Sequence, residues 1–406
     1  MDYVPRRLTA AIERARDTFP AVLVTGARQS GKTTLLCEEY GGSHRYVSLE
    51  RPEVRARAEA DPVSFLRENG PPVILDEIQA APELLHYVKE RIDEERTPGD
   101  WLLTGSQSFG LMQGVSQTLA GRTAVFHLDP LSTGECQAEA ASESLSDLLR
   151  GVFDGDGRDE TGAPSLMDWL LRGGFPEPCL NPNVDRQFWF SSYLQTYLER
   201  DVRDLANVTD LGAFRRFTFL VAAQTGRILN MSRLGRELGV TGPTIKRWMS
   251  VLEASGVVHL LPPYHRNLGK RIRRSPKVIL LDPGLATFLL GLHSSDAIRQ
   301  GPTWGTLVET AVITEWVKAC RQRGVRPDLF YWQSIGGQEV DLVMEQDGIV
   351  YGIEVKSTAT PRPSHAAGLA RWLEAMGPSA RGALACPVEE PCSLREGIRA
   401  IPWHLP

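Results

Sequence analysis

The sequence lacks the cysteine and histidine patterns of disulfide-rich and zinc-binding proteins. Its cysteines are scattered along 406 residues, with no C-x-x-C pair and no His/Cys ligand spacing. Scattered thiols are typical of reduced, cytoplasmic proteins, and they exclude a secreted disulfide framework. The six cysteines are Cys37, Cys136, Cys179, Cys320, Cys386 and Cys392.

Long hydrophobic runs and an excess of positive charge are also missing. No apolar stretch approaches the ~18 residues of a membrane span, and the first residues form an amphipathic segment rather than a signal peptide. The formal net charge of −5 excludes a uniformly basic nucleic-acid coat, so such contact requires a local patch. We expect a cytoplasmic protein without membrane contact, and its length predicts two or three domains.

A glycine-rich loop follows the first apolar run. Residues 21–24 predict a strand, and residues 26–33 match G-x-x-x-x-G-K-[ST] and lead into a helix. The glycines let backbone N–H groups surround phosphate oxygens, and the positive helix end points at the same anion. Lys32 would contact the β- and γ-phosphates, and the Thr33 hydroxyl would bind Mg²⁺. A glycine turn is the alternative to an ATP site formed by Gly26, Ala27, Arg28, Gln29, Ser30, Gly31, Lys32, Thr33 and Thr34.

Two adjacent acids end another apolar strand. Residues 73–75 run directly into Asp76 and Glu77. A buried strand rarely tolerates two adjacent acids unless a cation or a catalytic water accompanies them. Asp76 would hold Mg²⁺ through water, and Glu77 would polarise the attacking water. At the tip of a further predicted strand, Thr104 or Ser106 could sense the γ-phosphate, although an ordinary polar strand end is an equal alternative.

Strands that alternate with helices on short connections predict a parallel, three-layered α/β sheet with its ligand at the carboxyl ends of the strands. Hydrolysis also needs positive charge near the transition state in addition to Lys32. We favour Arg122, because it follows a glycine turn shortly after the sensor strand, over Arg28, Arg200 and Arg203. If Arg122 acts in trans, the protein forms a homo-oligomer.

The residue composition and the hydrophobic pattern change twice in the middle of the chain. Residues 136–165 are acidic and poor in apolar side chains, which predicts a linker or insertion. Residues 166–226 carry an aromatic stripe at helical spacing, which we interpret as core rather than as a base-stacking surface. Residues 227–284 have the pattern of two short helices joined by a turn and followed by two strands, which predicts a winged helix-turn-helix.

A basic segment joins the two predicted strands of this winged helix. Residues 264–277 contain six Lys or Arg and no acid, a composition that favours contact with DNA phosphates. The alternative is a lid or packing module whose basic loop neutralises the acidic linker or a neighbouring subunit. The predicted DNA-binding residues are Lys246, Arg247, Arg266, Lys270, Arg271, Arg273 and Arg274.

Charged residues interrupt two apolar strands near the C-terminal end. Asp341 lies on one predicted strand, and Glu354 and Lys356 alternate with apolar residues on the next, so both leave the same face. Acids on the two strands can share a divalent cation, and Lys356 can stabilise charge on a scissile phosphate. Glu309, on the preceding predicted helix 306–321, could add a further metal ligand. A solvated sheet face is the alternative.

Nearly the whole chain resembles prokaryotic AAA+-type P-loop ATPases whose C-terminal half is a domain of unknown function. Residues 26–33, 73–79, 103–106 and 119–122 carry the N-terminal resemblance, and Gly173-Gly174-Phe175-Pro176 and Ser275-Pro276-Lys277 are among the segments that carry the rest. Residues 339–341 and 353–357 are similar to the PD-(D/E)xK nuclease core. The expected divisions are an ATPase domain at 1–135, a linker at 136–165, a helical segment at 166–226, a winged helix at 227–284 and a restriction-endonuclease-like α/β domain at 285–406.

Motifs and resemblance together predict a protein that binds and hydrolyses ATP with Mg²⁺, contacts DNA through the winged helix and carries a Mg²⁺-dependent nuclease-like domain. A nucleotide-controlled switch for DNA or a protein partner, with a catalytically silent nuclease fold, is the alternative.

Overall fold

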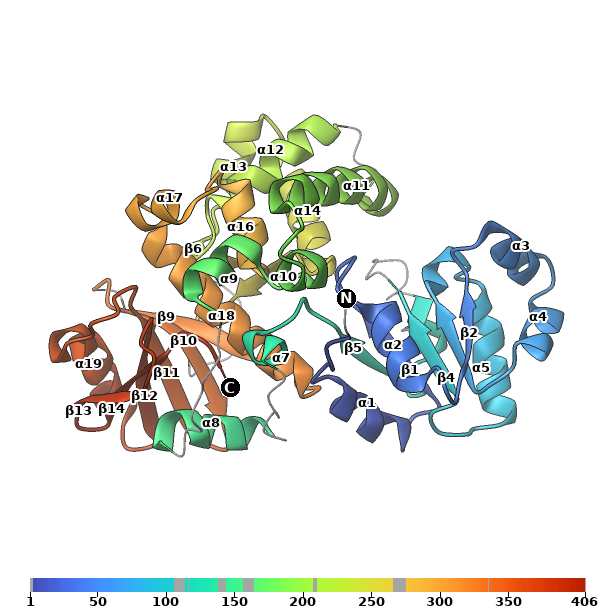
Figure 1. Ribbon diagram of the computed structural model, residues 1–406, viewed down its shortest axis with the longest axis horizontal. Helices are drawn as coiled ribbons and strands as arrows, with labels where there is room; N and C mark the ends of the chain where they lie inside the picture. The colour runs from blue at the N-terminus through green and yellow to red at the C-terminus, as the bar shows by residue number, and fades with distance from the viewer. Residues whose placement is uncertain are drawn as a thin grey trace.

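The computed structural model describes residues 3–105, 114–115, 117–137, 144–155, 164–206, 210–265, 275–334 and 336–405. In these ranges the elements gather into three groups, each built around one sheet (Figure 1). The five-stranded sheet belongs to the N-terminal group, the three-stranded sheet to the middle group and the six-stranded sheet to the C-terminal group.

The N-terminal group is a parallel sheet with the order β2-β3-β4-β1-β5. Its strands are β1 (Ala21–Thr25), β2 (Arg45–Ser48), β3 (Val73–Asp76), β4 (Trp101–Thr104) and β5 (Thr123–His127). Its helices are α1 (Thr9–Arg16), α2 (Lys32–Tyr40), α3 (Pro52–Ala60), α4 (Pro62–Glu68), the 3₁₀ turn η1 (Ile78–Ala80) and α5 (Leu84–Glu94). The pattern did not predict β5, because this edge strand is only partly buried and its apolar run is limited to the three residues 124–126.

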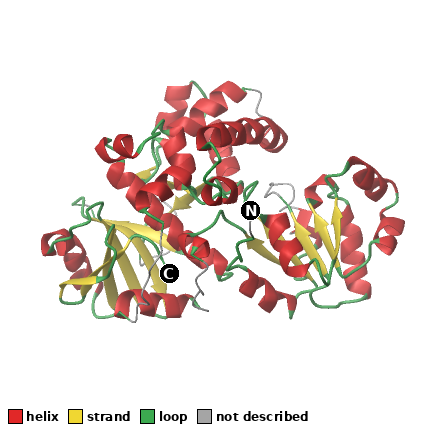
Figure 2. Ribbon diagram, in the orientation of Figure 1, coloured by secondary structure: helices red, strands yellow, loops and turns green. Residues whose placement is uncertain are grey.

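Both faces of the central strands β1, β3 and β4 are buried, and successive residues of each strand point to opposite sides. In β1, Leu23 packs with residues of α4 and α5, whereas Val22 and Val24 pack with residues of α1 and α2. Helices therefore cover the two faces (Figure 2), and the predicted three-layered α/β sheet is confirmed.

The middle group is mainly helical. Its helices are α7 (Thr133–Cys136), α9 (Leu166–Arg172), α10 (Pro176–Leu180), α11 (Arg186–Ala206), α12 (Leu211–Ala222), α13 (Met231–Leu238), α14 (Gly242–Ala254), α16 (Pro283–Leu289) and α17 (Ser295–Gln300). Helix α8 (Leu145–Asp154) follows α7 in the chain but lies beside the C-terminal sheet (Figure 1). Its sheet has the antiparallel order β6-β8-β7, with β6 (Arg227–Ile228), β7 (Val258–Leu261) and β8 (Lys277–Leu280). The two helices and two strands expected within residues 227–284 are confirmed as elements.

Helix α8 lies within the predicted acidic linker, and it does not behave as a solvated spacer. Leu148 and Leu149 are buried, and the Phe153 ring lies 4.9 Å from the ring of Tyr351 in the C-terminal group. The segment is acidic in composition, but its apolar residues share one face of a helix that packs on another part of the molecule.

The C-terminal group begins with the long helix α18 (Trp304–Gln322) and continues with a sheet of order β13-β14-β12-β11-β10-β9. Its elements are β9 (Leu329–Gln333), β10 (Glu339–Gln346), β11 (Ile349–Val355), the 3₁₀ turn η2 (Pro363–Ala366), α19 (Ala367–Met376), β12 (Ala380–Cys386), β13 (Cys392–Arg395) and β14 (Ile398–Pro402). The helix expected at residues 306–321 and the two strands expected to carry Asp341 and Glu354 are confirmed as α18, β10 and β11.

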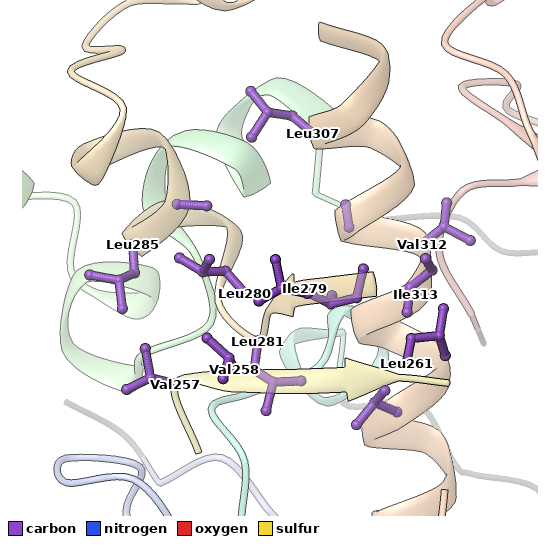
Figure 3. Packing of buried hydrophobic residues seen from close by; sticks show 14 of the residues in the cluster. Val257, Val258, Leu261, Ile279, Leu280, Leu281, Leu285, Leu307, Val312 and Ile313 are labelled. Atoms are coloured by element: carbon purple, nitrogen blue, oxygen red, sulfur yellow. The ribbon is translucent and has the colours of Figure 1, made fainter. Parts of the chain in front are cut away.

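One core joins the middle and C-terminal groups. Val258 on β7 and Ile279 on β8 pack in the same cluster as Val312 and Ile313 on α18 (Figure 3). This core extends across the predicted domain boundary at residue 284. Within the described ranges, no helix is both long and apolar enough to cross a membrane.

Candidate functional site

The loop between β1 and α2 has a backbone that favours glycine. Gly26 and Gly31 have φ values of 140° and 96°. A Cβ atom on Gly26 would lie 2.2 Å from the carbonyl oxygen of Leu128, so a side chain has no room there. Gly31 is the N-cap of α2, and the first N–H groups of that helix are therefore presented at the loop.

Lys32 brings positive charge to the same place. Its ammonium group donates hydrogen bonds to the carbonyl oxygens of Gly26, at 3.2 Å, and Ala27, at 2.9 Å. The lysine is 5% exposed, whereas Gln29 in the loop and Thr34 in the first turn of α2 are exposed. The loop thus combines amides, a helix N-terminus and an ammonium group, which are the usual binding groups for a polyphosphate.

Asp76 forms the second half of this site. Its Oδ1 accepts hydrogen bonds from the hydroxyls of Thr33, at 2.7 Å, and Thr104, at 2.6 Å, and its Oδ2 accepts one from Tyr46, at 2.9 Å. The aspartate is 4% exposed. Hydroxyl and carboxylate oxygens are the ligands that Mg²⁺ prefers, and they converge here beside the phosphate loop. Thr33 and Asp76 therefore fit the predicted Mg²⁺ site.

Thr104 also connects Asp76 to Glu77. The backbone N–H of Glu77 donates to the Thr104 hydroxyl at 2.9 Å. Glu77 has a left-handed backbone with φ of 57°, which is uncommon outside glycine, and its carboxylate accepts a hydrogen bond from the side-chain amide of Gln79. Thr104 thus lies where the sequence expects a sensor residue, and the other candidate, Ser106, lies outside the described residues.

Arg122 lies at the wrong end of the sheet for a role in its own nucleotide site. Its carbonyl accepts from the N–H of Ala21 at 3.1 Å, at the start of β1, whereas the phosphate loop follows the end of β1. Five strand residues span about 16 Å. The Arg122 guanidinium pairs with Asp93 at 2.6 Å and 3.0 Å. The predicted role within one chain is therefore wrong, and a role in trans stays a prediction.

Three other arginines are candidates for the same role. Arg28 is partly buried within the loop itself. The side chains of Arg200 and Arg203 lie outside the described part of the structure.

Arg6 is a contact of the loop that the sequence did not indicate. Its guanidinium donates to the carbonyl oxygens of Ser30, at 2.8 Å, and Asp129, at 2.7 Å, and to the carboxylate of Glu135, at 3.0 Å. Arg6 is 6% exposed, so these bonds form in a buried environment. It belongs to no motif and precedes the first helix, and only its tertiary neighbours reveal that it holds the loop against α7.

Two segments of the middle group border the phosphate loop. A Cβ atom on Gly256, just after α14, would lie 3.6 Å from the backbone nitrogen of Ala27. A Cβ atom on Gly31 would lie 4.0 Å from Cγ of Pro176, the first residue of α10. The turn after the second helix of the predicted winged helix is therefore a direct neighbour of the nucleotide loop.

The outer face of α14 carries the described part of the predicted DNA surface. Lys246 and Arg247 are exposed, whereas Ile245, Trp248 and Met249 are buried, as the helical pattern predicts. The other predicted DNA-binding residues lie outside the described residues, namely Arg266, Lys270, Arg271, Arg273 and Arg274.

In the C-terminal group, the structure brings the predicted charged residues together. Lys356 Nζ lies 2.5 Å from Glu354 Oε1, so the prediction that these side chains share one face is confirmed. Asp341 lies where the register between β9 and β10 is irregular, and its Oδ2 accepts from the backbone N–H of Val355 at 2.7 Å. Burial, followed by the charge of Asp341, raises the pKa of Glu354 to about 7 and that of Glu309 to about 8.

Lys277, which the sequence did not assign to this centre, lies among the acids. Its Nζ is 2.6 Å from Glu309 Oε1 and 3.8 Å from Asp341 Oδ1, and it also pairs closely with Glu339. Across the described ranges, no group of three or more His, Cys, Asp or Glu side chains is arranged to hold a metal. The predicted metal set of Glu309, Asp341 and Glu354 therefore does not fit a divalent cation as arranged, because an ammonium group lies between its members.

Comparison with known families divides the chain into three matches. Residues 18–137 match a family described as an AAA domain. Residues 163–296 match a domain of unknown function (DUF8612), and residues 304–405 match another domain of unknown function (DUF4143).

Two curated mycobacterial proteins are similar over most of the chain. They are "Uncharacterized protein Rv2008c" of Mycobacterium tuberculosis and "Uncharacterized protein Mb2031c" of Mycobacterium bovis, each 32% identical over 365 residues, which cover 88% of this chain and 74% of the relative. A solved structure, the Walker-type ATPase PABY2304 of Pyrococcus abyssi, is similar at 15% identity with a TM-score of 0.40, over 70% of this chain and 94% of that one.

Proposed function

The chain belongs to the family of these two mycobacterial proteins and is an AAA-type P-loop ATPase, and from this premise we propose that it hydrolyses ATP with Mg²⁺ at the loop between β1 and α2. One observation carries the proposal. The Thr33 hydroxyl and the Asp76 carboxylate meet at 2.7 Å beside Lys32, at the N-terminus of α2 and the carboxyl end of β3.

Each residue of the site has a separate role in the proposed hydrolysis. Backbone amides of residues 26–33 bind phosphate oxygens, and Lys32 balances charge on the β- and γ-phosphates. Thr33 and Asp76 would hold Mg²⁺, which would supply positive charge against the phosphates. Glu77 orients the attacking water and accepts its proton. Thr104 fixes Asp76 and Glu77 relative to each other through its two hydrogen bonds.

Steady-state ATP hydrolysis tests this assignment. Thr33→Val removes the hydroxyl with little change in volume, and we expect kcat to fall at least ~10-fold, with a higher Mg²⁺ requirement. Thr18→Val, at an exposed threonine in the turn after α1, is the matched control and should retain the wild-type rate. Normal turnover in Thr33→Val would overturn the Mg²⁺ assignment.

We further propose that residues 227–284 contact DNA as a winged helix and that bound nucleotide changes this contact. The exposed Lys246 and Arg247 on α14 support the first part, and the proximity of Gly256 to the Ala27 amide supports the second. Nucleotide in the loop would alter the surroundings of a turn that directly follows α14.

Duplex binding over a series of salt concentrations, with and without a non-hydrolysable ATP analogue, tests this proposal. Changing Lys246 and Arg247 to Ala together should weaken binding to all sequences alike and reduce the log–log salt slope by about 1 per lost phosphate contact. Lys89 and Arg91 changed to Ala on α5 form the matched control. ATP turnover indifferent to DNA, with weakly salt-dependent binding, would instead favour an acidic protein partner.

For the C-terminal group we propose the catalytically silent alternative. Asp341, Glu354 and Lys356 do converge, which is the observation in favour of DNA cleavage. The predicted metal ligands nevertheless pair with lysine ammonium groups, so we assign no metal-dependent step to them. Plasmid nicking in Mg²⁺ that disappears in Asp341→Ala would overturn this choice.

A further inference from the structure

Lys277 is the first residue of β8, the central strand of the middle sheet, but its side chain ends in the C-terminal group. The lysine is 3% exposed. Its ammonium contacts carboxylates from two elements, namely Glu309 on α18, and Glu339 and Asp341 on β10. It also lies 5.6 Å from the ring centroid of Tyr331 on β9. A side chain of one group thus forms part of the charged centre of another.

The buried ammonium of Lys277 and the carboxylates around it stabilise each other. A buried ammonium is unfavourable unless carboxylates neutralise it, and clustered carboxylates repel one another unless a cation lies between them. Lysine carries three N–H donors on a compact charge, so a single ammonium can serve several carboxylates. The 2.6 Å contact with Glu309 and the 3.8 Å contact with Asp341 place this charge among the acids that the sequence assigned to a metal.

We propose that the Lys277 ammonium is the resident cation of this centre and that a divalent metal can enter only by displacing it. The proposal is independent of ATP hydrolysis at the N-terminal loop. It explains why residues of a metal-dependent nuclease pattern converge in this chain without forming a metal-binding group among the described residues.

The same contact joins two groups of the molecule. Lys277 pairs with Leu261 and Ile228 across the middle sheet, and the backbone N–H of Tyr264 donates to the carbonyl of Tyr331 on β9 at 2.6 Å. The buried ion pairs therefore act at a junction where the middle sheet meets the edge of the C-terminal sheet. Lys277, which neutralises the acidic centre, therefore also connects β8 to the C-terminal group.

Titration of the full-length chain with Mn²⁺ in the absence of nucleotide, followed by the electron paramagnetic resonance of free Mn²⁺, tests the proposal. The wild type should show no saturable site that depends on Asp341. Lys277→Met removes the ammonium and leaves the carboxylates in place, and we expect it to gain one saturable Mn²⁺ site that the wild type lacks. The phosphate loop is the same in both proteins, so the difference reports the C-terminal centre.

Two further variants separate charge from packing. Lys277→Arg keeps the positive charge and should not gain Mn²⁺ binding, whereas Lys277→Met combined with Asp341→Asn should lose the gain. If Lys277→Met folds only when Mn²⁺ is present during refolding, recovery by Mn²⁺ supports the proposal, and no recovery overturns it. A wild-type Mn²⁺ site that Asp341→Asn removes, or a folded Lys277→Met without a new site, also overturns it.

Discussion

The two acidic centres of this molecule differ in the partners of their aspartates. Asp76 accepts hydrogen bonds from the neutral hydroxyls of Thr33, Thr104 and Tyr46. Asp341 lies near the ammonium of Lys277 and accepts from the backbone N–H of Val355. Hydroxyls orient a carboxylate without neutralising it, so its charge stays available to a metal, whereas an ammonium supplies the countercharge itself. A buried acid on a strand can therefore bind a metal only if no neighbouring side chain neutralises its negative charge.

The largest expected difference between the two centres is in how the loss of a lysine affects ATP turnover. Lys32→Ala removes the charge that balances the β- and γ-phosphates, and we expect kcat/KM for ATP to fall at least ~1000-fold with loss of nucleotide binding. Lys356→Ala removes a lysine from the C-terminal centre and should change turnover less than 2-fold, about the scatter of such assays. Fluorescent-nucleotide titration together with steady-state hydrolysis measures both effects. Equal losses in the two variants would contradict the separation of roles.

Replacing a glutamate in each centre should also affect ATP turnover very differently. Glu77→Gln keeps the shape of the side chain but removes the base, so we expect kcat to fall about 100-fold while the Kd for ATP is unchanged. Glu354→Gln is the matched change in the C-terminal centre and should alter only thermal stability. Single-turnover hydrolysis, with binding measured separately, distinguishes these outcomes. Normal ATP turnover in Glu77→Gln would remove the glutamate from the mechanism.

A smaller effect is expected at Thr104, which contacts Asp76 and Glu77 but no phosphate in the proposed mechanism. Thr104→Val removes both hydrogen bonds at nearly constant volume, and a loss of about 10-fold in kcat is expected from misplacement of the two acids. Thr314→Val, which removes a buried threonine hydroxyl from α18, is a control for general destabilisation. If both variants lose activity equally, the effect at Thr104 is one of folding.

The smallest effect is expected at Arg122, which lies at the start of the strands, whereas the phosphate loop follows the end of β1. Arg122→Ala breaks an exposed pair with Asp93, and such pairs contribute little to stability. For a monomer, we expect turnover to change less than 2-fold. Light scattering accompanies this assay, because a large loss in an oligomeric sample would indicate an arginine that acts in trans.

Local motifs made much of the N-terminal site predictable. The strand, loop and helix at residues 21–40 are contiguous, and Asp76 ends an apolar run, so pattern alone located both halves of the site. The position of Arg122 was not predictable in this way, because β5 is a partly buried edge strand without a clear pattern. Proximity to a glycine turn in sequence did not imply proximity to the phosphate loop in space.

The sequence pattern predicts the acids of the C-terminal centre but not their cation. Alternation on a strand placed Glu354 and Lys356 on one face, as observed. Lys277 was counted as part of a basic segment, because nothing in its local sequence indicates that β8 directs it toward Glu309, 32 positions away. Arg6 was missed for the same reason, since its contact with Glu135 spans 129 positions. Both contacts arise from tertiary packing.

The number of Mn²⁺ ions bound per full-length chain, measured with and without a non-hydrolysable ATP analogue, tests the contrast between the two centres most directly. We predict that a tight Mn²⁺ site forms only with the nucleotide, that Asp76→Asn removes it and that Asp341→Asn leaves it intact. A site that forms without nucleotide and is lost in Asp341→Asn would show that the C-terminal centre, and not the phosphate loop, binds the metal.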